Sequence, residues 1–568
     1  VRVDALSAFF AAPVFLLGAV AGVAAYVRSA YLRIFFGVMT GALALMMAAG
    51  NTILFLVMWE VVAAAAFFLV ASEHDHPDVR RAAWIYLAAS HIATLALFAV
   101  VVMLHNATGT WSFTAIHGAA PFAILWLALV AFGIKAGLMP FHVWLPGAHA
   151  AAPSHVSAFM SGVVIKMGIY GLVRVLSLYD AIPPSFAAVV LVAGIVSSIF
   201  GVAFALAQHD LKRLLAYHSI ENIGIIVTGI GVGLVAQAHH HPALAMLGYA
   251  GALLHVWNHG LFKALLFLSG GAAAHAVHTR DMEKMGGLAR VMPWTASAFL
   301  IGAAAISGLP PLNGFVSEWL LYVAGFITTT SRAASGVDLL IVLVVPALAL
   351  TGALALACFV KAFGVVFLGA PRTHEAANAR ETTLASRFAM LPLVIACVAI
   401  GFLPALLTPV LTRVVHIAAP RATGDLAPML RPIQTAALIF AAVAAVAIAT
   451  LIAATRRAPR TVTWDCGYLD PTPRMQYTAS SFARGLVAMF AWAMPPETHA
   501  PHSLPLFPKE AAFESHVPDT ILDRALLPTI RAGQRFFAFA RFIQSGRVQL
   551  YLLYVGVTLL ILLAWSAA

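Results

Sequence analysis

The residues best suited to chemistry in this chain are ionisable side chains inside long apolar segments. Glu60, Lys135 and Lys166 lie among apolar neighbours, and Glu318 and Lys361 lie in two later apolar segments. A charge at the centre of a bilayer costs at least about 2.5 to 3.5 kcal/mol, so an ionisable group placed there is a candidate for function. These five residues are predicted to take up and release protons.

A polar stripe lies in the segment His255-Val-Trp-Asn-His259-Gly-Leu-Phe-Lys263. Spacings of four residues place His255, His259 and Lys263 on one face of a helix, over about 12 Å at 1.5 Å per residue. Imidazole titrates near neutral pH and burial favours the neutral form of a lysine, so the stripe could pass protons through hydrogen bonds and bound water. A metal site is the alternative, but two histidines alone lack a third ligand and the glutamate of a His-Glu-x-x-His sequence.

Carboxylates and lysines on neighbouring helices could form coupled pairs. Gain or loss of a proton at one member changes the proton affinity of the other, which is the coupling that a pump requires. Either Glu318 or Lys361 could end such a series. The alternative is a set of static ion pairs that fix the packing of the helices.

Transmembrane helices must hold these residues. Of 568 residues, 62% are hydrophobic and only 10% are charged, whereas soluble domains carry about 25% charged residues. The mean hydropathy is +0.93, and the apolar runs are about 20 residues long, which suits a helix that crosses a bilayer. A porin-like barrel would instead show alternating segments of about ten residues. The predicted fold is an all-α, polytopic transmembrane bundle.

About fourteen spans are predicted from the apolar runs. They cover residues 5–27, 31–49, 51–71, 83–104, 122–139, 154–178, 186–207, 217–237, 245–270, 293–328, 336–369, 388–411, 433–455 and 548–566.

The formal net charge of +11 reflects basic residues in alternate loops, so it indicates topology and not binding to nucleic acid. With the N-terminus outside, one side receives Arg28, Arg33, Arg80, Arg81, Lys212, Arg213, Arg280, Lys284, Arg290, Arg456, Arg457 and Arg460. The opposite loops at 105–121, 179–185 and 238–244 hold no Lys or Arg, and the exceptions on that side are Arg332, Arg413, Arg421 and Arg431. The basic side is predicted to be cytoplasmic, in a multi-pass protein of the inner membrane.

Two spans are interrupted by glycine and proline. The breaks lie five spans apart and contain Gly137 and Pro140 in the first and Gly308, Pro310 and Pro311 in the second. Paired broken helices indicate two inverted five-helix repeats with a site near the bilayer midplane, although ordinary proline kinks would look alike. The predicted parts are N-terminal helices at 1–49, repeats at 31–178 and 186–369, C-terminal helices at 388–455, a cytoplasmic extension at 456–547 and a final helix at 548–568.

The extension is polar and rich in proline, and within it 519–546 interleaves arginine with large apolar residues. This pattern predicts an amphipathic helix along the membrane surface or against a partner. Cys358, Cys397 and Cys466 stand far apart, so neither a disulfide framework nor a metal centre is expected in this chain. The chain opens at Val1 without the basic region of a signal peptide, and residues are expected before it.

Four segments together carry a resemblance to a known family. They are Gly133 to Pro153, which reads GIKAGLMPFHVWLPGAHAAAP, His209 to Ser219, the stripe from His255 to Lys263, and Ser307 to Glu318. Over about residues 1–410 the chain resembles the antiporter-like subunits of respiratory complex I, whose fold is shared with multisubunit sodium/proton antiporters and group 4 membrane-bound hydrogenases.

The resemblance implies a proton channel with a Glu–Lys pair, a central lysine and a terminal Lys or Glu. Matching motifs make Glu60 and Lys135 the pair, Lys263 the central lysine and Glu318 the terminal residue, while Lys166 resembles a further lysine of some members. The family's glutamate lies on its fifth helix and Glu60 on the third span here, which implies that two N-terminal helices are absent.

The C-terminal segments Trp464 to Tyr468 and Arg474 to Phe482 resemble the hydrogenase-4 component B and formate hydrogenlyase branch. This implies a non-catalytic, ion-translocating subunit without cofactors of its own. A nickel–iron centre and iron–sulfur clusters would belong to a peripheral hydrogenase-type module, and the other partners would be membrane subunits, including further antiporter-like subunits, and lipids. The alternatives are a subunit of complex I, a cation/proton antiporter or ion-coupled transporter without redox partner, and a structural membrane anchor. The translocated ion could be a proton or sodium, and transport in either direction is compatible with the sequence.

Overall fold

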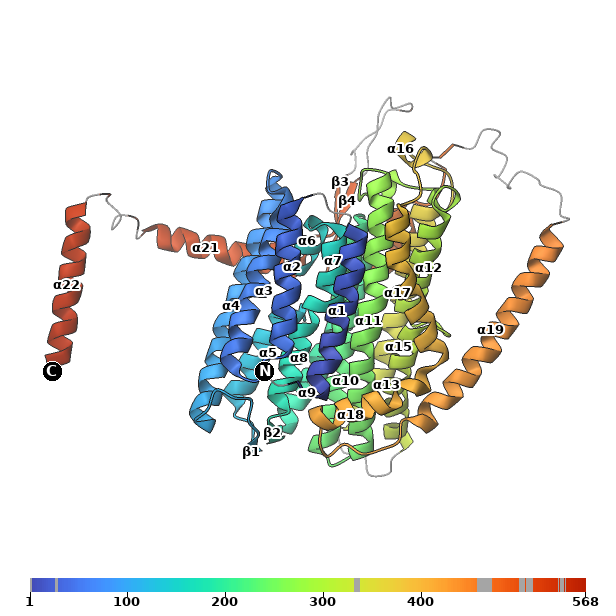
Figure 1. Ribbon diagram of the computed structural model, residues 1–568. Helices are drawn as coiled ribbons and strands as arrows, with labels where there is room; N and C mark the ends of the chain where they lie inside the picture. Colours follow the sequence, from blue (N-terminus) through green and yellow to red (C-terminus); the bar gives the residue numbers. More distant parts are fainter. Residues whose placement is uncertain are drawn as a thin grey trace.

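The computed structural model describes residues 3–25, 29–330, 338–456, 472–473, 475–499, 506, 514–539, 541, 546 and 548–567. Figure 1 shows most of the tall helices standing side by side in one bundle, with α19 and α22 directed away from it. Among the described helices, eleven are long and apolar enough to cross a membrane, and each of the fourteen predicted spans overlaps a described helix. The prediction of an all-α, multi-pass membrane protein is confirmed.

The first half of the bundle contains α1 (Ala5–Ala25), α2 (Ala30–Met47), α3 (Thr52–Val70), η1 (Ala71–Glu73), α4 (Pro77–Thr108), α5 (Phe122–Ala136), α6 (Leu145–Ala151), α7 (Ser154–Phe159), the π-helical turn η2 (Met160–Val164) and α8 (Lys166–Leu176). The second half contains α9 (Pro184–Leu206), α10 (Leu211–Ala238), α11 (Pro242–Ala276), η3 (Met282–Lys284), η4 (Leu288–Arg290), α12 (Pro293–Ile306), α13 (Asn313–Thr330), α14 (Asp338–Val342) and α15 (Val344–Phe367). The remaining helices are α16 (His374–Ala377), α17 (Leu384–Phe402), η5 (Pro404–Leu407), α18 (Thr408–Ala418), α19 (Ala427–Thr455), α20 (Ala479–Met489), η6 (Thr520–Leu526), α21 (Leu527–Ala538) and α22 (Val548–Ala567).

Helices α10 and α11 form the centre of the bundle. Nearly every side chain of α10 is buried, whereas only three residues of the 29-residue α19 are buried and the span within α22 has none. Apolar side chains exposed in this way suit contact with lipid, because the bilayer core contains no water. The polar residues of α10 and α11 are therefore enclosed by protein.

The two predicted broken helices are present. Helix α5 ends at Gly137, which has a φ of +76°, and the chain crosses Pro140 before α6 begins. Helix α12 ends before Gly308, which has a φ of +63°, and the chain crosses Pro310 and Pro311 before α13. A positive φ favours glycine because it has no Cβ. In Figure 1, α5 rises toward the end that carries α6 and α12 descends from that end, as inverted repeats require.

Most of the predicted basic loops lie at one end of the bundle, the upper end in Figure 1. Arg81 lies 3.7 Å from Asp523, Arg280 lies 3.2 Å from Asp210, and a β-bridge joins Asp210 to Asp281. We call this the basic end. The predicted residues Arg28, Arg332, Arg457 and Arg460 lie outside the described residues, as do Cys466, residues 464–468 and Arg474.

Two pairs of short strands are local exceptions to the all-α fold. Strand β1 (Ile116–Ala119) pairs in parallel with β2 (Tyr179–Ala181), and β3 (Glu497–His499) pairs antiparallel with β4 (Glu514–His516). These strands have three or four residues and lie in loops, so they are too short to show the alternation of polar and apolar residues that identifies a strand.

The predicted amphipathic segment forms the helices η6 and α21, and the part beyond Ala538 lies mostly outside the described residues. Figure 1 shows α21 running sideways from the bundle at the basic end. Phe536 and Phe537 on α21 are 76% and 72% exposed. A basic helix with exposed aromatic side chains suits the membrane surface or a neighbouring subunit.

A buried polar cluster anchors η6 and α21, which we call the arm, to the bundle. The carboxylate of Asp519 lies 3.1 Å from His142 Nε2, in the break between α5 and α6, and accepts a hydrogen bond of 2.9 Å from the hydroxyl of Tyr217 on α10. Its other oxygen caps η6 by accepting from the backbone of Ile521 and Leu522. Burial alone would raise the pKa of Asp519, but its hydrogen bonds, the one with His142 foremost, bring that pKa down to about 2.

We expect Asp519→Ala to release the arm from the bundle, because it leaves His142 and Tyr217 buried without their partner. Breaking a buried pair costs about 3 to 5 kcal/mol. Hydrogen exchange of the backbone at 514–526 should accelerate, while Glu497→Ala, which removes only an exposed contact with Arg524, should leave it unchanged. In the unmodified chain, docking of the arm should also depend on pH. Because a free aspartate has a pKa of about 3.9, docking should be fully stable above pH 4 and should weaken as the pH falls toward 2. Equal exchange in both variants would show that Asp519 does not anchor the arm.

Candidate proton pathway

Glu60 lies on the outer face of helices α3 and α4. Its carboxylate accepts a hydrogen bond from the hydroxyl of Thr94 and lies 3.5 Å from His91 Nδ1. The side chains of Glu60 and His91 are 36% and 54% exposed. Ionisable groups in the middle of a span need polar surroundings, so this face is suited to a neighbouring membrane subunit rather than to lipid alone.

Lys135 lies in the last turn of α5 and is buried. Its ammonium lies 5.0 Å from the ring centre of Trp59 and 5.9 Å from that of Tyr86, at distances typical of cation–π contacts. Its Nζ has no hydrogen-bond partner among the described residues. Glu60 and Lys135 are not within 4.0 Å of each other, and Glu60 contacts Thr94 and His91 on α4.

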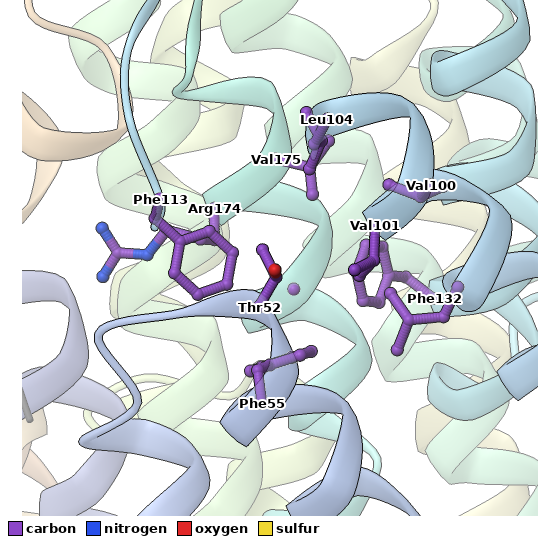
Figure 2. Close-up of a pocket in the computed structure, with 11 residues that line it drawn as sticks. Thr52, Phe55, Val100, Val101, Leu104, Phe113, Phe132, Arg174 and Val175 are labelled. Carbon is purple, nitrogen blue, oxygen red and sulfur yellow. The ribbon is translucent and has the colours of Figure 1, made fainter. Parts of the chain in front are cut away.

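An apolar pocket lies between these helices and the end opposite the basic end. It is lined by Thr52, Phe55, Leu97, Val100, Val101, Leu104, Phe113, Phe132, Gly171, Arg174 and Val175. Figure 2 shows the phenylalanine and valine side chains around the pocket, with the guanidinium of Arg174 pointing away from it. That guanidinium pairs with Asp4 at 2.6 Å. This lining offers Lys135 no chain of polar groups toward that end.

Lys166 is the first residue of α8 and lies two residues after the π-helical turn. Its ammonium donates to the backbone carbonyl of Ser161, inside that turn, and the hydroxyl of Ser161 lies 2.8 Å from that of Ser219 on α10. A π-turn interrupts the regular hydrogen-bond ladder of a helix and is frequent at functional sites. The turn supplies the lysine with a carbonyl and links it to α10.

The predicted stripe is buried on α11. The rings of His255 and His259 lie 6.5 Å apart, and His255 contacts Asn222 Oδ1 at 3.0 Å and Ser317 Oγ at 2.9 Å. Neither ring nitrogen of His259 has a partner among the described residues. Lys263 donates to the carbonyl of Leu215 on α10. The three predicted side chains therefore share one face, directed at α10 and α13.

Glu318 lies on α13 beside the second break and is 6% exposed. A Cβ on Gly308 would lie 2.7 Å from its carboxylate oxygen. The absence of a side chain at Gly308 therefore makes room for the carboxylate.

Lys361 on α15 is held at the end of α9. Its ammonium donates to the carbonyls of Leu206 at 2.6 Å and Gln208 at 3.0 Å. The carbonyls at the C-terminus of a helix lack partners within the helix and carry partial negative charge, so they favour a nearby cation.

The buried ionisable residues that were not predicted as part of a pathway include three on α6 and α10. His149 on α6 stacks on Phe267 with ring centres 5.3 Å apart, and both its ring nitrogens lack partners among the described residues. His218 and Glu221 on α10 are hydrogen-bonded to each other. Glu221 lies inside an apolar span, which is the signal that identified the other residues and could have found it.

The unpartnered buried atoms of Lys135, His149 and His259 have a physical consequence. Buried polar groups are almost always hydrogen-bonded, to protein or to ordered water. We therefore expect water around these side chains, which would connect the first half of the bundle to the stripe. Among the described residues, no group of three or more His, Cys, Asp or Glu side chains is placed to hold a metal ion.

Broken helices, buried lysines and an enclosed histidine stripe define a membrane ion-translocation subunit of the antiporter type. The chain belongs to the NADH:quinone oxidoreductase/Mrp antiporter transmembrane family, which matches residues 49–351.

Two relatives come from Escherichia coli K12. The chain is 34% identical to hydrogenase-4 component B, over 99% of this chain and 88% of the relative, and 36% identical to formate hydrogenlyase subunit 3, over 78% and 72%. A solved structure of the archaeal membrane-bound sulfane sulfur reductase includes a chain with a similar fold, with a TM-score of 0.75, 23% identity and coverage of 99% and 89%. The two relatives confirm the antiporter-like family, and their names describe each of them as one part of a larger complex; the solved structure confirms the fold.

We expect Gly308→Ala to destabilise the second break and displace Glu318. Alanine at this position would have to adopt an unfavourable positive φ, and its methyl group would collide with the Glu318 carboxylate. The cost should be roughly 1 to 3 kcal/mol. The melting temperature of the purified protein should fall, whereas Gly352→Ala, inside α15 where a Cβ meets nothing within 4 Å, should not lower it because alanine favours a helix over glycine. Equal melting temperatures for the two variants would contradict this account of the break.

Proposed function

We propose that this chain translocates protons as a membrane subunit of a group 4 nickel–iron hydrogenase of the hydrogenase-4 or formate hydrogenlyase type. The observation that carries this proposal is the series of buried ionisable side chains across the centre of the bundle. Lys135, Lys166, Lys263 and Glu318 mark its course, and histidines lie between them.

The chain's own residues would hold and pass protons. An ammonium at Lys166 and one at Lys263 repel each other, since like charges in a medium of low dielectric interact strongly. A proton gained at one lysine therefore favours release at the other. His255 and His259 can carry the proton toward Glu318 because each ring has one nitrogen that donates and one that accepts.

The hydrogenase assignment is supported by the 34% identity to hydrogenase-4 component B over nearly the whole chain. In this proposal, nickel–iron and iron–sulfur centres belong to a peripheral partner module. Further antiporter-like subunits would pack in the membrane beside this one, and the exposed pair of Glu60 and His91 is a suitable contact.

We also propose the sidedness and the repeats. The basic end would face the cytoplasm, with residues 456–547 on that side of the inner membrane. Residues 31–178 and 186–369 would form the two inverted repeats, which the opposite directions of α5 and α12 support.

A cation/proton antiporter subunit without redox partner is the second candidate, because the matching family also includes Mrp antiporters. Purification from native membranes discriminates the two. A nickel-containing subunit in the purified complex supports the hydrogenase, and a complex of membrane subunits alone supports the antiporter.

Lys263→Ala and Glu60→Gln should lower proton uptake by inverted membrane vesicles that are energised by the electron donor of the complex. We expect at least about a tenfold loss for Lys263→Ala, in line with the effect of removing a proton-transfer group. Electron transfer in the partner subunits should persist or become uncoupled. Lys284→Ala changes a largely exposed lysine and should leave uptake intact; unchanged uptake in both pathway variants would show that these charges are structural.

A further inference from the structure

A second series of polar groups runs from the basic end toward Lys263, and of its members only Lys361 was predicted from the sequence. It begins at the loop between α9 and α10, where the side chain of His209 is 27% exposed and lies 3.8 Å from the carboxylate of Glu283. Glu283 is 28% exposed and pairs with Arg372 at 3.0 Å. Proton-binding groups at this loop are therefore open to solvent.

Lys361 lies directly beneath this loop. It binds the carbonyl of Gln208, the residue next to His209, and that of Leu206. The lysine is only 1% exposed, and no described carboxylate lies within 4.0 Å of it. Its ammonium therefore connects the solvated loop to the interior of the bundle.

The next groups lie one turn along α15 and on the facing side of α10. Cys358 is buried, and the ring of Phe359 stacks on that of His218 with centres 4.5 Å apart. His218 Nδ1 is hydrogen-bonded to Glu221, whereas its Nε2 is buried and has no partner among the described residues. A histidine with one nitrogen on a carboxylate and the other unpartnered is arranged to relay a proton.

Glu221 completes the connection to the stripe. It is 1% exposed and lies on α10, where Lys263 binds the carbonyl of Leu215. Leu215 lies one helical turn before His218 on α10, and no described carboxylate lies within 4.0 Å of the Lys263 ammonium, which binds the Leu215 carbonyl instead. A buried carboxylate beside a lysine can accept a proton and hand it on.

We propose that His218 and Glu221 form an uptake relay that brings protons from the basic end, through Lys361, to Lys263. A proton from Lys361 binds His218 Nε2 while the proton on Nδ1 passes to the Glu221 carboxylate, so the ring returns to its neutral form. Glu221 then gives its proton to the neutral amine of Lys263 and becomes a carboxylate again. Lys361 regains a proton from solvent through the loop at His209.

This relay rests on the proposed function, in which Lys263 belongs to the translocation pathway. It assigns Lys361 to uptake instead of to the end of the series, which leaves Glu318 as the terminal residue. Two separate routes then meet at Lys263, an inlet along α10 and α15 and an outlet along α11 and α13.

The test compares proton uptake by inverted vesicles that contain the intact complex, with electron transfer by the partner subunits as the reference. Glu221→Gln keeps the shape of the side chain but cannot exchange a proton, and it should lower uptake per electron by about tenfold or more. Glu221→Asp should retain much of the uptake, because it restores the carboxylate. Glu375→Gln removes an exposed carboxylate at the basic end and should have no effect.

His218→Gln and Lys361→Gln interrupt the relay at other points. They test the relay if the complex with Glu221→Gln does not assemble. Lowered uptake in both supports the relay. Normal uptake in the relay variants beside a loss in Lys263→Ala would overturn the relay and leave the proposed function standing. Normal uptake in Lys263→Ala itself would remove the proposed function, and the relay with it.

Discussion

The fold depends on how it stabilises ammonium groups inside an apolar bundle. An unpaired charge in such a medium is very costly, yet Lys166, Lys263 and Lys361 have no described carboxylate in contact. Each is bound instead by backbone carbonyls, those of Ser161, Leu215 and Leu206 with Gln208. A carbonyl is neutral and does not fix the proton on the lysine as a carboxylate would. The lysines are thus held in place while their protons remain exchangeable.

The interruptions of the helices supply much of this environment. The π-turn after α7 provides the carbonyl for Lys166, and the C-terminus of α9 provides those for Lys361. Gly308, in the second break, leaves space for the carboxylate of Glu318. The same break that weakens a helix therefore creates a polar site inside the bundle, and the hydrogen bond between Asp519 and His142 connects the first break to the arm.

The sequence was sufficient for the elements and for most of the buried charges. Apolar length predicts the spans, and glycine with proline predicts the breaks at Gly137 and Gly308, because both signals are local. Contacts between distant segments could not be predicted: nothing in the sequence links Asp519 to His142, 377 residues apart. The same holds for the contacts of Glu60 with Thr94 and His91 on α4, since the direction of a side chain on a helix is fixed by packing.

The central claim is that the buried charges belong to one hydrated pathway. A cryo-EM map of the intact complex, sharp enough to show ordered water, tests it most directly. We predict water density within hydrogen-bonding distance of Lys135 Nζ and of the ring nitrogens of His149 and His259. Dry apolar packing against these atoms, or a direct ion pair between Glu60 and Lys135 that isolates them from the stripe, would contradict it.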